Sequence, residues 1–106
     1  MRRLNFRSAA TSDLRGLARY TRARWGEEQA AAYVATLRNQ IKSLQEFPLR
    51  FPEFEGPNAG LRRMSSGHHQ VFYLVGDDQT EILRVLHEAM DFGERLRGNY
   101  IVDLAI

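Results

Sequence analysis

The chain has 106 residues, no cysteine, and 15 basic against 13 acidic side chains, which is the size and composition of one soluble domain. The lack of cysteine excludes disulfides and thiolate metal sites. There is no apolar run of about 18 residues to span a membrane, and the N-terminus lacks the apolar segment of a signal peptide. We therefore expect residues 1–106 to form one cytoplasmic domain with no membrane contact, no metal and no cofactor.

The chain opens with a predicted strand and a first helix. Residues 3–7 alternate, with Leu4 and Phe6 on one side, as in a short strand. Ser8 is the expected helix N-cap, and Gly26 is placed to end the helix with a positive φ. If the ring of Trp25 is buried by this helix, Trp25→Ala should cost about 3–5 kcal/mol. The expected apolar stripe recurs at spacings of three and four and consists of Ala10, Leu14, Leu17, Ala18, Thr21 and Trp25.

A second helix follows at once. Glu27 and Glu28 fall in its first turn, where negative charge is favourable, and Pro48 stops it. The short connection predicts an antiparallel helical hairpin. Its expected apolar stripe is Ala30, Tyr33, Val34, Leu37, Ile41 and Leu44.

The second half of the chain predicts a loop and then strands. All the prolines lie in residues 48–60, a loop that we expect Phe47, Phe51 and Phe54 to hold against the body. Residues 61–66 read as a polar edge strand, and Gly67 turns the chain. Both strands that follow are apolar on both faces, apart from Arg84. They cover residues 70–75 and 80–87 and are joined by a hairpin turn at 76–79.

Two further features follow the last strand. Residues 90–96 fit a short helix, and the tail at 97–106 is too apolar to be a free, solvated segment. The whole order predicts an α+β fold in which the N-terminal strand and a three-stranded antiparallel meander form one sheet, with the helical hairpin on one face. We expect the tail to dock on this body or on a partner.

Several segments resemble the ParE-type toxins of the RelE/ParE superfamily. Residues 10–14 are similar to the A-x-x-D-L opening of the family's first helix, and Trp25-Gly26 to its end. Residues 71–73 are similar to its φ-F-Y strand. Residues 82–87, followed by Met90-Asp91, are similar to the closing I-x-R-V-L-H-x-x-M-D signature. The resemblance runs from about residue 4 to residue 96, and its order and spacing are more specific than any single motif.

This resemblance implies a fold, a function and partners. ParE-type toxins share their fold with RelE ribonucleases but poison DNA gyrase, and they are not themselves enzymes. A ParD-like antitoxin encoded beside the toxin neutralises it in a hetero-oligomer, and operator DNA is bound only through that antitoxin. We expect the antitoxin segment to cover an apolar groove between the hairpin and the sheet. The residues that we assign to that contact are Leu17, Tyr20, Trp25, Tyr33, Leu37, Arg62 and Arg63.

The main alternative is a RelE-like, ribosome-dependent messenger ribonuclease. Metal-free RNA cleavage needs a base, an acid and cations for the phosphate. Here Arg62 or Arg63 and Arg84 would bind the phosphate, and His87 or Tyr73 would transfer the proton. A protein-binding module without toxicity is a third reading.

Each candidate also has a structural interpretation, which we favour. His87 fits a hydrogen-bonded histidine at a strand end and Tyr73 a core residue. Arg84 fits a partly buried, paired arginine, because an unpaired buried charge is costly. His68 and His69 are neighbours that an extended chain points to opposite faces, so they do not readily share a metal ion.

One compositional feature has two explanations. All basic residues except Lys42 are arginines, which bind carboxylates and phosphates well, but we take the Arg codon preference of a GC-rich genome as the main cause. Acidic residues are spread along the chain and leave no basic block, so composition alone predicts no nucleic-acid binding. We expect the arginines between residues 2 and 24 to form a solvated face or to pair with an acidic partner segment.

Overall fold

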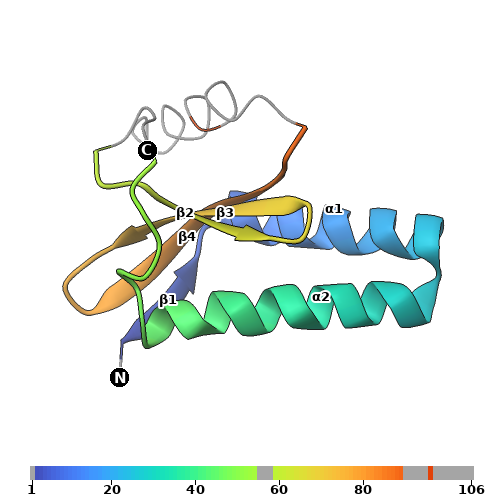
Figure 1. Cartoon of the computed structure of the whole chain (residues 1–106), viewed down its shortest axis with the longest axis horizontal. Coiled ribbons are helices and arrows are strands. Elements are labelled where there is room, and N and C mark those ends of the chain that lie inside the picture. Colours follow the sequence, from blue (N-terminus) through green and yellow to red (C-terminus); the bar gives the residue numbers. More distant parts are fainter. Residues whose placement is uncertain (1, 55–58, 90–95, 97–106) are drawn as a thin grey trace.

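A computed structural model of the chain describes residues 2–54, 59–89 and 96 (Figure 1). The order of its elements is the predicted one, with a short 3₁₀-helix, η1, added after the second helix. The predicted helix at 90–96, apart from Leu96, and the tail at 97–106 lie outside the described residues. The elements are β1 (Arg3–Phe6), α1 (Ser8–Trp25), α2 (Glu27–Lys42), η1 (Ser43–Gln45), β2 (Arg62–Ser66), β3 (His69–Val75) and β4 (Gln79–His87).

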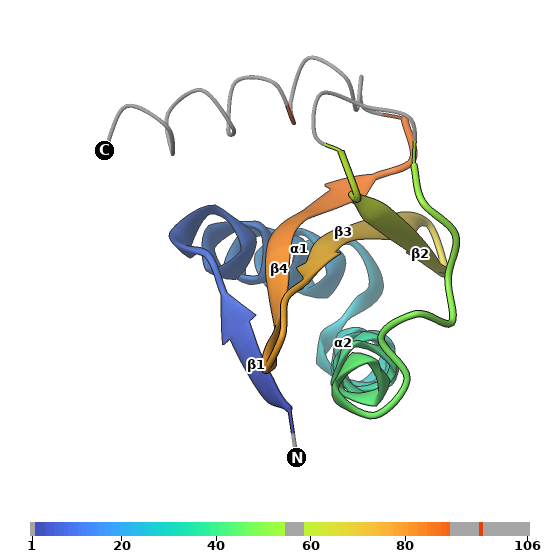
Figure 2. The ribbon, with the colours of Figure 1, turned by 90° about the vertical axis from the view of Figure 1, so that its left-hand side faces the viewer.

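The strands form one sheet in the order β1-β4-β3-β2 (Figure 2). β2, β3 and β4 make the predicted antiparallel meander, while β1 pairs in parallel with β4. The register between β3 and β4 shifts at Phe72/Tyr73. β1 reaches along β4 only as far as Ile82, so the later part of β4 has an edge that β1 does not cover. The α+β class and the edge position of β2 are confirmed.

The two helices begin and end largely as the sequence predicts. Gly26 has a φ of 91°, and its N–H bonds to Arg22 O, so it ends α1 and allows α2 to follow directly. The prediction of Ser8 as N-cap is wrong by one residue. Ser8 is the first helical residue, and Arg7 is the cap, although its side chain makes no capping hydrogen bond to the helix. α2 ends at Lys42, and the 3₁₀ turn, not Pro48 itself, closes it.

Two apolar clusters lie on the two faces of the sheet. The larger is formed where α1 and α2 pack on the sheet, and its members include Leu14, Leu37, Ile41, Tyr73 and Ile82. Successive strand residues point to opposite faces, so a second cluster forms on the other side. Its buried members are Leu61, Phe72, Leu83, Leu86 and Leu96, with Phe54 and Leu74 packed against them.

Two aromatic residues that we expected to pack, Trp25 in the stripe of α1 and Phe47 against the body, are exposed instead. Trp25 is 56% exposed and Phe47 is 53% exposed, whereas Phe51 and Phe54 do pack against the body as predicted. The reason for Trp25 is that the helical hairpin extends beyond the strands, so the last turn of α1 has no sheet beneath it (Figure 1). The cost of 3–5 kcal/mol for Trp25→Ala therefore does not apply.

None of the helices in the described part of the chain is long and apolar enough to cross a membrane.

Candidate functional site

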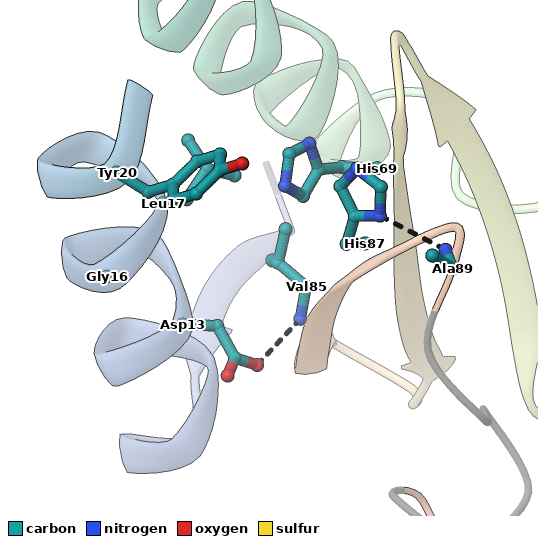
Figure 3. A pocket seen from close by; sticks show the side chains of 8 residues that line it. All are labelled: Asp13, Gly16, Leu17, Tyr20, His69, Val85, His87 and Ala89. Atoms are coloured by element: carbon teal, nitrogen blue, oxygen red, sulfur yellow. Dashed lines mark hydrogen bonds between the residues drawn. The ribbon is translucent and has the colours of Figure 1, made fainter. Parts of the chain in front are cut away.

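A groove runs between the outer part of α1 and the ends of β3 and β4. It consists of two adjoining pockets of about 490 and 580 Å³, which share Tyr20, His69 and His87 in their walls. The first pocket continues along α1 past Leu17 and Gly16 to Asp13 (Figure 3). The second continues toward the hairpin tip, past Thr21, Arg24, Trp25, Gln29, Tyr33, His68 and Glu88.

The α1 wall of the groove is apolar and aromatic. Leu17 is buried at its base, while Tyr20 is 62% exposed and Trp25 is 56% exposed. Gly16 carries no side chain, which keeps the wall low between Asp13 and Tyr20 (Figure 3). The Arg24 guanidinium lies 5.8 Å from the centroid of the Trp25 ring. Exposed Trp, Tyr and Arg side chains are the residue types that dominate the energy of protein interfaces.

The opposite wall is held in place by the hydroxyl of Tyr33, on α2. This hydroxyl accepts the backbone N–H of His68 at 3.1 Å and lies 2.7 Å from His69 Nδ1. Gly67 has a φ of 58°, and a Cβ there would lie 2.7 Å from the Tyr33 hydroxyl. Only glycine therefore lets the β2–β3 turn approach α2 so closely.

Three imidazoles meet at this wall. The rings of His69 and His87 make an edge contact with centroids 5.3 Å apart, and His68 stacks on His87 at 6.4 Å. His87 Nδ1 accepts the backbone N–H of Ala89 at 3.1 Å, and His68 Nδ1 lies 2.9 Å from Glu88 Oε1. Burial, with smaller contributions from the positive forms of His87 and His68, lowers the pKa of His69 from 6.5 to about 4. His69 is therefore neutral at physiological pH.

Asp13 locks α1 to the uncovered edge of β4. Its Oδ2 accepts from Arg84 Nε at 2.7 Å and from the Val85 backbone N–H at 2.9 Å, and its Oδ1 accepts from Arg84 Nη2 at 2.9 Å. The side chains of Asp13 and Arg84 are 15% and 16% exposed. The expectation of a partly buried, paired Arg84 is confirmed, and Asp13 satisfies an N–H that β1 leaves without a strand partner.

The candidate ribonuclease residues are only partly brought together: Arg62 and Tyr73 are partners across β2 and β3, whereas His87 lies in the groove. Tyr73 is fully buried, and its hydroxyl donates to Pro48 O at 2.8 Å. Arg62 pairs in register with Tyr73 and donates to Phe51 O at 2.6 Å. Burial raises the pKa of the Tyr73 phenol further above 10. Arg84 is bound to Asp13, and His87 lies at the far end of β4, in the groove.

The residues assigned to the antitoxin also divide into groups. Leu17, Tyr20, Trp25 and Tyr33 line the groove. Leu37 is 1% exposed in the core, so it offers no surface to a partner. Arg62 and Arg63 lie at the end of β2 away from the turn that borders the groove, where the Arg63 guanidinium lies 5.0 Å from the Phe54 ring centroid.

Sequence reasoning missed the grouping of the histidines. It considered His69 only as a metal ligand, and argued against that role, and it gave Asp13 only a place in a motif. No group of three or more metal-ligating side chains suited to an ion occurs among residues 2–54, 59–89 and 96. The spacing of residues carries no signal for the contact of Tyr33 with the β2–β3 turn, because that contact joins elements 36 residues apart.

Comparison with known proteins agrees with this fold. The family model of the ParE toxin of type II toxin–antitoxin systems (parDE) matches residues 4–92. Toxin ParE1 of Caulobacter vibrioides is 44% identical over 82 residues, which cover 77% of this chain and 84% of the relative.

Two solved structures share the fold at lower identity. The chromosomal ParDE system of P. aeruginosa superposes with a TM-score of 0.72 at 21% identity, covering 82% of this chain and 96% of the other. The RelBE2 toxin–antitoxin complex of Mycobacterium tuberculosis gives 0.62 at 22% identity, covering 81% and 96%. The family match spans most of the chain and includes both walls of the groove, so the chain belongs to the ParE toxin family of type II toxin–antitoxin systems.

Proposed function

We propose that this toxin inhibits DNA gyrase in the cytoplasm and that an antitoxin encoded beside it neutralises it by occupying the groove. Family membership and the resemblance of its motifs to gyrase-poisoning ParE toxins support the target. The observation that carries the choice over RNA cleavage is that Arg62, Tyr73 and Arg84 are each already hydrogen-bonded within the fold, while His87 lies apart from them in the groove.

The existing hydrogen bonds of these side chains matter because a general acid or base must reach the proton that it transfers. The Tyr73 hydroxyl is buried and donates its proton to Pro48 O, and its raised pKa opposes ionisation. The Arg84 guanidinium would have to leave Asp13 before it could bind a phosphate. Of the candidate residues, only His87 lines the groove, where Arg24 packs over the Trp25 ring and none of the arginines assigned to the phosphate is present. This is a weak basis for a nuclease.

The groove supports the antitoxin part of the proposal. It is long and open, and it presents exposed Tyr20 and Trp25 beside buried Leu17. A partner segment that is disordered when free can wrap such a surface and folds as it binds. In this arrangement, operator DNA is bound by the antitoxin and reaches the toxin only through it. Among the exposed apolar residues, Phe47 and Leu49 lie outside the groove and have no role in this proposal.

Purified components test the target. The toxin should inhibit supercoiling by DNA gyrase and leave ribosome-bound messenger intact, and added antitoxin should restore supercoiling. Tyr73→Phe removes the only proton that this side chain could transfer and keeps its ring in the core, so the variant should inhibit gyrase as the original chain does. Codon-specific messenger cleavage that Tyr73→Phe abolishes, with gyrase unaffected, would assign the chain to the ribonucleases instead.

Expression in cells tests the pairing. Induction of the toxin alone should arrest growth and raise the DNA-damage response, and co-expression of the adjacent reading frame should prevent both and give a stable complex on gel filtration. A chain that is harmless alone and does not associate with its neighbour's product would instead be a binding module without toxicity.

A further inference from the structure

The proton on His87 can be placed from its hydrogen bond. Its Nδ1 lies 3.1 Å from the backbone nitrogen of Ala89. A backbone N–H can only donate, so this Nδ1 accepts and carries no proton. A neutral imidazole has one N–H, which in His87 is therefore on Nε2.

The same reasoning applies to His69, through Tyr33. The Tyr33 hydroxyl already accepts from the His68 backbone N–H, so its single proton must be donated elsewhere. The acceptors within reach are His69 Nδ1 at 2.7 Å and Ser66 O at 3.5 Å. If His69 Nδ1 donated to the hydroxyl instead, the hydroxyl's own proton would be left with only the 3.5 Å contact to Ser66 O, which is at the limit for a hydrogen bond. His69 Nδ1 then accepts, and with the ring neutral its proton is also on Nε2.

Both Nε2–H groups are free to act as donors. Among the described residues, neither nitrogen has a hydrogen-bond partner, and both rings line both pockets of the groove. In Figure 3 the two rings lie across the pocket from Leu17 and Tyr20. We propose that the Nε2–H groups of His69 and His87 form a two-donor subsite that binds a side-chain carboxylate of the antitoxin segment in the groove. This inference rests on the proposed neutralisation by an antitoxin.

The charges around the groove favour a carboxylate as the acceptor. Of the two carboxylates in its walls, Asp13 is bound to Arg84 and Glu88 contacts His68, and among the described residues neither bonds to His69 or His87. Arg24 lines the same groove, and among the described residues it has no ion pair. The His69 and His87 rings are neighbours, with centroids 5.3 Å apart, and a carboxylate has two oxygens that can accept from two donors.

Two matched substitutions at His87 distinguish the contribution of its N–H donor to antitoxin binding from the contribution of its ring. His87→Gln keeps an N–H donor near the position of Nε2, whereas His87→Phe keeps a ring and removes the donor. Affinity for the full-length antitoxin encoded beside this gene is measured by calorimetry. Loss of a hydrogen bond to a charged group should weaken binding about 10- to 100-fold in His87→Phe, and His87→Gln should retain most of the affinity. Thermal melts followed by circular dichroism check that both variants fold.

The carboxylate is identified from the antitoxin's side, against the original toxin. Single Asp→Asn and Glu→Gln changes are made along the antitoxin segment. One change should weaken binding to the original toxin about tenfold and have no effect on binding to His87→Phe, as expected for two groups in direct contact. In ¹⁵N spectra, the free toxin should show His69 and His87 protonated on Nε2, and both N–H signals should move downfield on binding.

The outcomes distinguish this inference from the proposed function. If the antitoxin binds tightly but neither His87→Phe nor any carboxylate change alters its affinity, the subsite is refuted and neutralisation in the groove stands. The subsite is equally refuted if either ring proves to be protonated on Nδ1. If the antitoxin does not bind the original toxin at all, both proposals fall.

Discussion

Removal of the Asp13 carboxylate should strongly destabilise the domain. Asp13→Ala leaves Arg84, which is 16% exposed, without its partner, and leaves the Val85 backbone N–H without an acceptor. Breaking a buried ion pair on one side costs about 3–5 kcal/mol, and an unsatisfied buried N–H costs about 1–3 kcal/mol. These costs overlap, so we expect a loss of about 3–5 kcal/mol, a large part of the 5–15 kcal/mol that holds a typical domain folded.

Urea unfolding followed by far-ultraviolet circular dichroism measures this loss, because the exposed Trp25 is a poor fluorescence reporter of the core. Asp78→Ala is the matched control. It breaks an ion pair with Arg3 whose side chains are 71% and 75% exposed, and such surface pairs contribute only about 0–1 kcal/mol.

A double variant tests the mechanism. Arg84→Met in the Asp13→Ala background removes the unpaired charge, so it should recover part of the lost stability even though a second native residue is gone. The Val85 N–H stays unsatisfied, and recovery should therefore be incomplete. Equal losses in Asp13→Ala and Asp78→Ala, or a further loss in the double variant, would refute the view that Asp13 locks α1 to β4.

Three further changes have outcomes that follow from the structure. His69 has its pKa lowered from 6.5 to about 4 in the fold, so stability should be complete above about pH 6.5 and fall as the pH drops toward 4, and His69→Gln should flatten this dependence in thermal melts. Trp25→Ala should change the free energy of unfolding by less than about 0.5 kcal/mol yet weaken antitoxin binding by about 2 kcal/mol in calorimetry. Gly67→Ala should cost more than about 1 kcal/mol in urea unfolding, and Tyr33→Leu should relieve part of that cost.

The order of the elements was predictable because each has a local signal. These signals lie within short segments of the sequence. They are the helical stripes at spacings of three and four, Gly26 between the helices and Gly67 between the strands. The apolar character of both faces of β3 and β4 correctly indicated that these strands are central. The same logic placed Arg84 in a pair, because a charge on such a strand needs a partner.

The predictions that failed concern residues whose burial or partners depend on how distant elements are placed relative to one another. Trp25 continues the apolar periodicity of α1, but the sheet ends before it, so periodicity alone predicted burial that does not occur. Leu37 was assigned to a partner surface although its spacing on α2 fits the core equally well. The carboxylate that pairs with Arg84 was not identified, since Asp13 lies 71 residues away in the chain.

The use of the polar residues is the main structural argument for the proposed binding function over catalysis, because a fold alone does not decide between the two. In the same sheet, a nuclease would need its cations and its proton donor free and facing one site. Here Arg62 and Tyr73 hold the loop through Phe51 O and Pro48 O, and Arg84 holds α1 through Asp13. The side chains of these residues are hydrogen-bonded within the fold. The aromatic surface beside α1 and the imidazoles that face it line the groove and are accessible to a partner. Such a division favours recognition of another protein over chemistry on a nucleic acid, and it directs mutagenesis to the groove.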